Sequence, residues 1–157
     1  MRRAARLVGL TMGAGIICVP LAAARPDPAA VQKVVDVRVA HYKEIGKAAK
    51  AIKDELGQSQ PNLATVSANA RAIEALAMQI PNWFPSGTGE QPGVKTEALP
   101  IIWDQSALFK QRAAGLAGAA HGLAAAAGTG NAAAALAASN NVGGACRACH
   151  ETFRQKK

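Results

Sequence analysis

The fold is decided by residues 27–57, which read DPAAVQKVVDVRVAHYKEIGKAAKAIKDELG. Asp27 is a good N-cap, and Pro28 suits the first helical position because its missing N–H would have no partner there. Inward-facing residues recur at steps of three and four as far as Gly57, which predicts one long amphipathic helix. The stripe consists of Val31, Val34, Arg38, Tyr42, Ile45, Ala49, Ile52 and Leu56.

Three more helices are predicted, because the chain has hardly any strand-like alternation and is rich in residues that favour helices. After a turn at 58–62, the second helix ends where Pro81 cannot continue it. Its stripe consists of Leu63, Val66, Ala70, Ile73, Ala77 and Ile80. The third is predicted from about Asp104 to Ala127. Its inward face is expected to hold Leu108, Arg112, Leu116, Ala119 and Leu123.

The fourth helix and the connections complete the expected fold. Gly128-Thr129-Gly130 ends the third helix and Asn131 caps the fourth. The fourth is expected to carry Leu136, Val142, Cys149 and Phe153 inward. Residues 81–100 are rich in Pro and Gly, which predicts a long crossing loop between the second and third helices. We therefore expect an all-α protein, one antiparallel four-helix bundle.

The first 24 residues have the pattern of a secretory signal peptide. Three arginines precede an uncharged apolar stretch at 7–21, and residues 22–24, all alanine, offer a small-residue cleavage site. A membrane anchor would need roughly 20 apolar residues, whereas this stretch is shorter and contains Pro20. We expect residues 1–24 to be cleaved and residues 25–157 to form the bundle of an exported protein, without a membrane attachment.

Cleavage would leave a modestly basic protein. The chain has 18 Lys and Arg against 10 Asp and Glu, and the leader removes three arginines, which leaves a net charge of +5. With few aromatic residues and no basic run before Arg154, nucleic acid is not an expected partner, and a docking surface for acidic partners is favoured. Cleavage also removes Cys18. Cys146 and Cys149 would then lie in an oxidising compartment, where free thiols rarely persist.

The motif Cys146-Arg147-Ala148-Cys149-His150 gives these two sulfur atoms a covalent role, because C-x-x-C-H is the sequence of c-type haem attachment. On one helical turn the two sulfurs reach the two vinyl groups of a porphyrin, and His150 is held beneath the iron as its ligand. A structural zinc site would need more cysteines or histidines, and a thioredoxin-type dithiol would accompany a βαβ pattern. We therefore predict one haem c, bound through two thioethers.

Arg38 and Tyr42 lie one turn apart on the stripe of the first helix. A charge inside a bundle costs several kcal/mol unless it is paired, and an anionic haem propionate would be a natural partner for Arg38. Alternatively, the Arg38 stem packs while its head reaches water. If Arg38 binds a propionate, Tyr42 lies near the far side of the iron, where its phenol would shield the site or bind a diatomic gas. Otherwise Tyr42 is a core aromatic.

Three residues are candidates for a sixth iron ligand. Met78 lies off the stripe of the second helix, and His121 is rotated away from the apolar face of the third. His41 lies about 60° from Arg38 on the helical wheel. Ligation by His41 or Met78 would make a six-coordinate, low-spin electron carrier. A haem peroxidase would need a distal acid–base residue, for which His41 is the one candidate, so we do not expect an enzyme.

Further motifs are spread along the mature chain. They are Arg38-x-x-x-Tyr42-x-x-x-Gly46-x-x-x-Lys50-x-Ile52, Asn69-Ala70-Arg71, Gln79-Ile80-Pro81-x-Trp83-Phe84-Pro85, Ala98-Leu99-Pro100-x-Ile102-Trp103 and the segment from Cys146 to Arg154. In this combination, with the haem motif near the C-terminus, the chain resembles the cytochrome c prime family, the class II c-type cytochromes.

The resemblance implies a periplasmic antiparallel four-helix bundle, often a homodimer through its first two helices. In the low-spin branch of the family a methionine stands where Tyr42 stands here and ligates the iron. In the high-spin branch a non-ligating residue leaves the iron five-coordinate. With Tyr42, this chain is similar to the second branch, which binds nitric oxide and carbon monoxide and transfers single electrons. The resemblance therefore implies redox partner proteins. Arg154 matches the basic residue of the family beside the proximal face of the haem.

Overall fold

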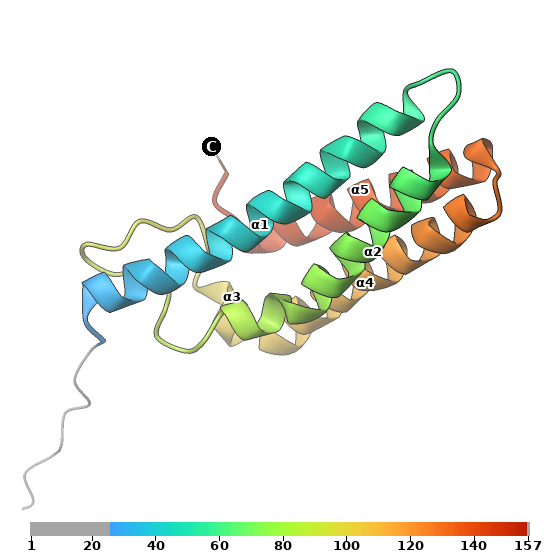
Figure 1. The fold of residues 1–157 in the computed structure, drawn as a ribbon. Coiled ribbons are helices and arrows are strands. Elements are labelled where there is room, and N and C mark those ends of the chain that lie inside the picture. Colours follow the sequence, from blue (N-terminus) through green and yellow to red (C-terminus); the bar gives the residue numbers. More distant parts are fainter. Residues whose placement is uncertain (1–25, 157) are drawn as a thin grey trace, which may run out of the picture.

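The computed structural model describes residues 26–156, and the predicted signal peptide lies outside them. It shows the predicted all-α, antiparallel four-helix bundle (Figure 1). The four long helices are α1 (Pro28–Leu56), α2 (Leu63–Gln79), α4 (Ser106–Gly128) and α5 (Ala132–Phe153). Two short helices, η1 (Ile80–Trp83) and α3 (Ile101–Asp104), lie in the connection between α2 and α4.

Side chains close the N-terminal ends of three long helices. Asp27 accepts a hydrogen bond from a first-turn N–H of α1 at 3.1 Å. Asn62 does the same for α2 at 3.1 Å, and Asn131 for α5 at 3.0 Å. Each cap satisfies a backbone donor that the helix itself leaves without an acceptor. The caps predicted at Asp27 and Asn131 are therefore confirmed.

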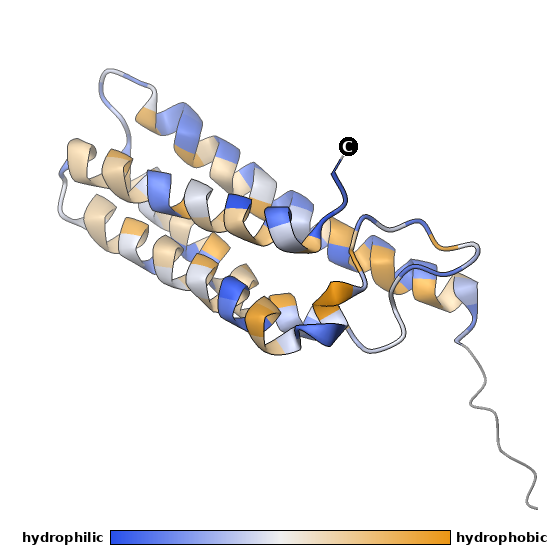
Figure 2. Ribbon diagram, turned by 180° about the vertical axis from the view of Figure 1, so that it is seen from behind, coloured by the Kyte–Doolittle hydropathy of each residue, from blue (hydrophilic) through white to orange (hydrophobic). Residues whose placement is uncertain are grey.

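The predicted inward faces of α1 and α2 agree well with the structure, but those of α4 and α5 were partly wrong. Arg112 is exposed, and half of the surface of Leu136 is exposed to solvent. The buried face of α4 consists of Phe109, Ala113, Leu116, Ala120, Leu123, Ala124 and Ala127. Figure 2 shows long pale stretches where alanine and glycine follow one another. Because small residues occupy every side of these helices, hydrophobic periodicity orients them only weakly.

The start of the third long helix also differs from the prediction. Gln105 has φ −111° and ψ 44°, outside the helical region, and separates α3 from α4. The helix predicted from Asp104 therefore begins at Ser106, and Ile101–Asp104 form a turn of their own.

The long connection covers the N-terminal half of α1, which extends beyond the other helices (Figure 1). Val94 of the connection packs with Val31 and Val35 in a small second core. Further along, the connection pairs with the end of α5, where Leu99 N–H donates to Phe153 O at 3.0 Å. This pairing fixes the connection beside the residues that follow the haem motif. No helix of the described residues is long and apolar enough to cross a membrane.

Candidate haem site

A cavity of about 410 Å³ lies among α1, α4, α5 and the long connection. α1 and α5 contact each other much less than α4 and α5 do, so the bundle is open on this side. The apolar part of the lining includes Ile45, Ile80, Phe84, Ile102, Phe109, Leu116 and Phe153. The volume and the apolar lining are those of a site for a small organic group.

The three residues of the haem motif that would bind the group line this cavity from the last turns of α5. Cys146, Cys149 and His150 are all among its lining residues, and both thiols are half-buried. Burial raises the pKa of each thiol, and the nearby cations of Arg147 and Arg112 oppose this shift at Cys146 and Cys149 respectively. Burial lowers the pKa of His150, as does Arg154, and both therefore favour the neutral imidazole. A neutral imidazole is the form that binds a metal.

Arg38 lies under the long connection, with 2% of its surface exposed. Its Nη2 donates hydrogen bonds to Thr88 O at 2.8 Å and to Thr96 Oγ1 at 3.1 Å. The guanidinium also lies over the Phe84 ring, 4.6 Å from its centroid. Burial lowers the pKa of Arg38. The head is therefore not in water, as the alternative of a solvated head required. Arg38 lines the cavity, and its binding to a propionate stays a prediction.

Tyr42 lines the same cavity one turn along α1. Its ring meets Trp83 edge-on, with centroids 5.5 Å apart, and also contacts Phe84. Burial raises the pKa of the Tyr42 phenol well above its ordinary value, so the hydroxyl stays protonated. The structure thus brings Arg38 and Tyr42 to the cavity that holds the haem motif.

Arg154 lines the cavity from the residue after α5. Its Nε and Nη2 both reach Glu97 Oε2, at 2.8 and 2.6 Å. Sequence reasoning did not identify Glu97, Thr88 or Thr96, because they lie in the long connection. Hydrophobic periodicity applies to residues within a helix and does not predict the path of a connection between helices.

The three candidates for a sixth ligand lie outside the described lining of the cavity. His41 stacks on Trp83, with ring centroids 4.6 Å apart. Met78 is 64% exposed and lines a separate groove between α2 and α4. His121 lines that groove too, and its Nδ1 lies 3.0 Å from Glu74 Oε1.

Comparison with known proteins decides the family. The sequence profile described as Cytochrome C' matches residues 33–154. The chain belongs to the cytochrome c' family. A cytochrome c' of Pararhodospirillum photometricum is 36% identical over 128 residues, which are 81% of this chain and 100% of that protein.

Solved structures agree with this assignment. A cytochrome c' described as having an unusual ligand-controlled dimer dissociation is 33% identical, with a TM-score of 0.73 over 80% of this chain and 97% of its own. The nitric oxide complex of a leucine-to-alanine mutant of cytochrome c' from Alcaligenes xylosoxidans is 28% identical, with a TM-score of 0.64 over 84% and 98%. As a member of this family, the chain described here binds one covalent c-type haem. The apolar cavity, with two thiols and a neutral imidazole on one wall, fits that group.

Proposed function

We propose that this cytochrome c' holds its haem through thioethers from Cys146 and Cys149, with His150 as the iron's one protein ligand. In this proposal the protein is periplasmic, binds nitric oxide and carbon monoxide, and passes single electrons. When bound, the haem supplies an iron that takes up a diatomic gas or exchanges one electron. Cys146, Cys149 and His150 would hold the group, and the apolar lining of the cavity would limit the access of water to it.

One observation carries the five-coordinate proposal: no residue of the cavity lining, in the part of the chain that the structure describes, is a strong second axial ligand. His41 is held by its stacking on Trp83, and Met78 faces the α2–α4 groove. Tyr42 does line the cavity, but its buried phenol is neutral, and a neutral phenol is a poor iron ligand. These placements favour an open site over the six-coordinate alternative with His41 or Met78.

The same placements argue against a peroxidase. General acid–base catalysis needs a titrating side chain within hydrogen-bond reach of the reacting atoms. His41 is the residue that the peroxidase alternative required, and it lies outside the cavity lining. Gas binding needs no such group, and the solved nitric oxide complex is that of a relative with the same fold. We therefore propose a binding and electron-transfer protein.

A homodimer through α1 and α2 is the proposed assembly. Val37 is 57% exposed on α1 and does not line the haem cavity, so a second copy could cover it. One solved relative is described by its dimer dissociation. Sedimentation of the protein and of Val37→Lys tests this surface: we expect a dimer that the substitution weakens, and a monomeric parent protein would contradict it.

The absorption spectrum of the ferrous protein, with and without carbon monoxide and nitric oxide, tests the open site. We expect a broad high-spin band that sharpens when either gas is added. The Tyr42→Met variant is the control, because a methionine at this position is expected to reach the iron and block carbon monoxide. A sharp low-spin spectrum of the parent protein, unchanged by carbon monoxide, would show that a protein ligand closes the iron.

A further inference from the structure

The mouth of the haem cavity is basic. Three exposed cations line it from three parts of the fold: Lys43 of α1, Arg112 of α4 and Arg154 after α5. Arg38 lies beneath them, and Glu97 is the one carboxylate among the described lining residues. With four cations against one carboxylate, the lining stays positive even after the two negative charges of the haem propionates are added.

The cations lie close to the haem motif. Arg112 and Arg154 line the same cavity as Cys149 and His150, and the backbone N–H of Arg154 donates to His150 O at 3.2 Å. Cys149 and His150 are the residues that hold the edge of the haem and its iron. A partner that sits against Arg112 and Arg154 is therefore close to the redox centre.

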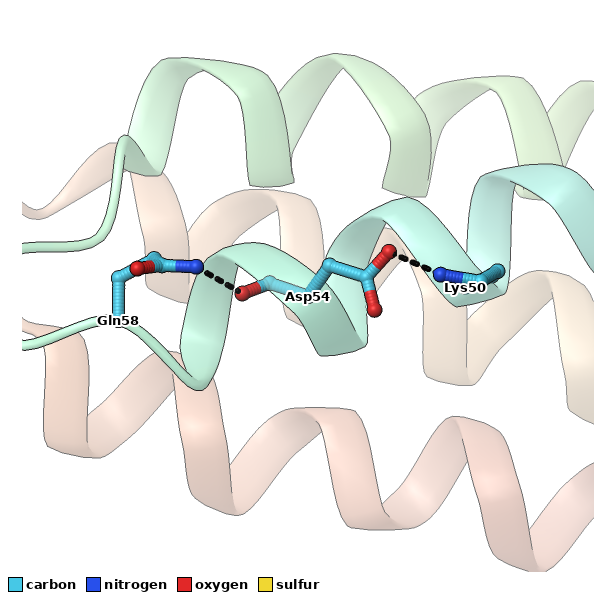
Figure 3. A network of polar contacts seen from close by, with 3 residues as sticks. All are labelled: Lys50, Asp54 and Gln58. Atoms are coloured by element: carbon cyan, nitrogen blue, oxygen red, sulfur yellow. Dashed lines mark hydrogen bonds and ion pairs between the residues drawn. The ribbon is translucent and has the colours of Figure 1, made fainter.

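Two neighbouring lysines on α1 differ from Lys43 in their pairing. Lys47 pairs with Glu44 at 2.7 Å, and Lys50 pairs with Asp54 at 2.5 Å (Figure 3). Lys43 and Arg112 have no ion pair among residues 26–156. Their charges are thus available to a partner, whereas those of Lys47 and Lys50 are largely neutralised within the helix.

We propose that Lys43 and Arg112 form the docking surface for an acidic one-electron redox protein, beside the ion pair of Arg154 with Glu97. This inference rests on the proposed electron transfer and adds where on the protein the partner binds. Opposite charges steer the encounter and raise its rate. In the complex the ferrous cytochrome loses one electron and the partner gains one; no covalent bond forms or breaks and no proton is transferred.

Two small oxidants of opposite charge test the surface on the haem-loaded protein. Ferricyanide is anionic and tris(phenanthroline)cobalt(III) is cationic, and each takes one electron. We compare the double variant Lys43→Gln with Arg112→Gln against the matched control Lys53→Gln with Arg71→Gln, which removes the same charge. Lys53 lies about 15 Å further along α1, and neither control residue lines the cavity. All four side chains are exposed.

At low salt we expect the mouth variant, relative to the control, to react about fivefold more slowly with ferricyanide and about fivefold faster with the cobalt reagent. In molar salt both differences should vanish, because the screening length is then about 3 Å. Equal rates in the two variants would overturn the proposal. A change in the same direction with both reagents would also overturn it, since it would indicate an altered driving force. Carbon monoxide binding by the parent protein tests the gas site independently.

Discussion

Replacing Arg38 by methionine should destabilise the protein by about 3 kcal/mol even without haem. Methionine keeps an unbranched apolar stem but removes the donors to Thr88 O at 2.8 Å and Thr96 Oγ1 at 3.1 Å. A hydrogen bond from a charged donor contributes about 1.5–3 kcal/mol, and a cation over an aromatic ring about 0.5–2 kcal/mol. The cost of burying the charge, which is also removed, offsets part of the sum.

Urea unfolding of two forms of the protein measures the loss of free energy of unfolding caused by Arg38→Met. One is the haem-loaded protein, and the other is the protein with both motif cysteines changed to alanine and the haem extracted. Because a propionate would be a further partner of Arg38, we expect a larger loss in the loaded form. Equal losses would refute the propionate contact. A loss below about 1 kcal/mol in the haem-free form would refute the importance of the hydrogen bonds to the connection.

Three further predictions concern the cavity. Tyr42→Ala should speed carbon monoxide association several-fold in flash photolysis, and an unchanged rate would place the phenol away from the gas path. Tyr42 is the one tyrosine of the chain, so its phenolate absorption is unambiguous. Burial raises the pKa of Tyr42, so the phenolate of the folded protein should appear only well above pH 10. Because the unfolded chain loses this proton first, the free energy of unfolding should fall as the pH rises past about 10. Titration at the ordinary value would contradict its burial. Phe109→Ala should lower the free energy of unfolding in urea by about 3–5 kcal/mol. The Phe109 ring is 4% exposed and packs edge-on against Phe84 and Phe153. A loss under about 1 kcal/mol would show that neighbouring side chains fill the cavity left by the ring.

Much of the fold could be predicted because its signals are local. Three such signals depend only on neighbours in sequence. They are the N-cap at Asp27, the end of the second helix before Pro81, and the spacing of Val66, Ala70 and Ile73 by four and three residues. The burial of Arg38 followed from its place in such a stripe. Where alanine and glycine fill every side of a helix, as in α4, the same argument fails, and the prediction put Arg112 on the buried face.

The site was predictable where one motif contains it and not where distant segments build it. Cys146, Cys149 and His150 are fixed by spacing on one helix, and the structure places them on one cavity wall. Glu97 and Thr96 reach the site through the long connection, whose path depends on its packing against α1 and α5. The spacing of residues in the sequence gives no information about that packing.

Acid acetone extraction of the haem is the measurement that tests the account most directly. In the parent protein, thioether bonds from Cys146 and Cys149 should keep the haem with the precipitated polypeptide. In the double variant Cys146→Ala with Cys149→Ala, the haem should pass into the acetone. Haem that extracts from the parent protein, or that stays with the double variant, would contradict covalent attachment at these two residues.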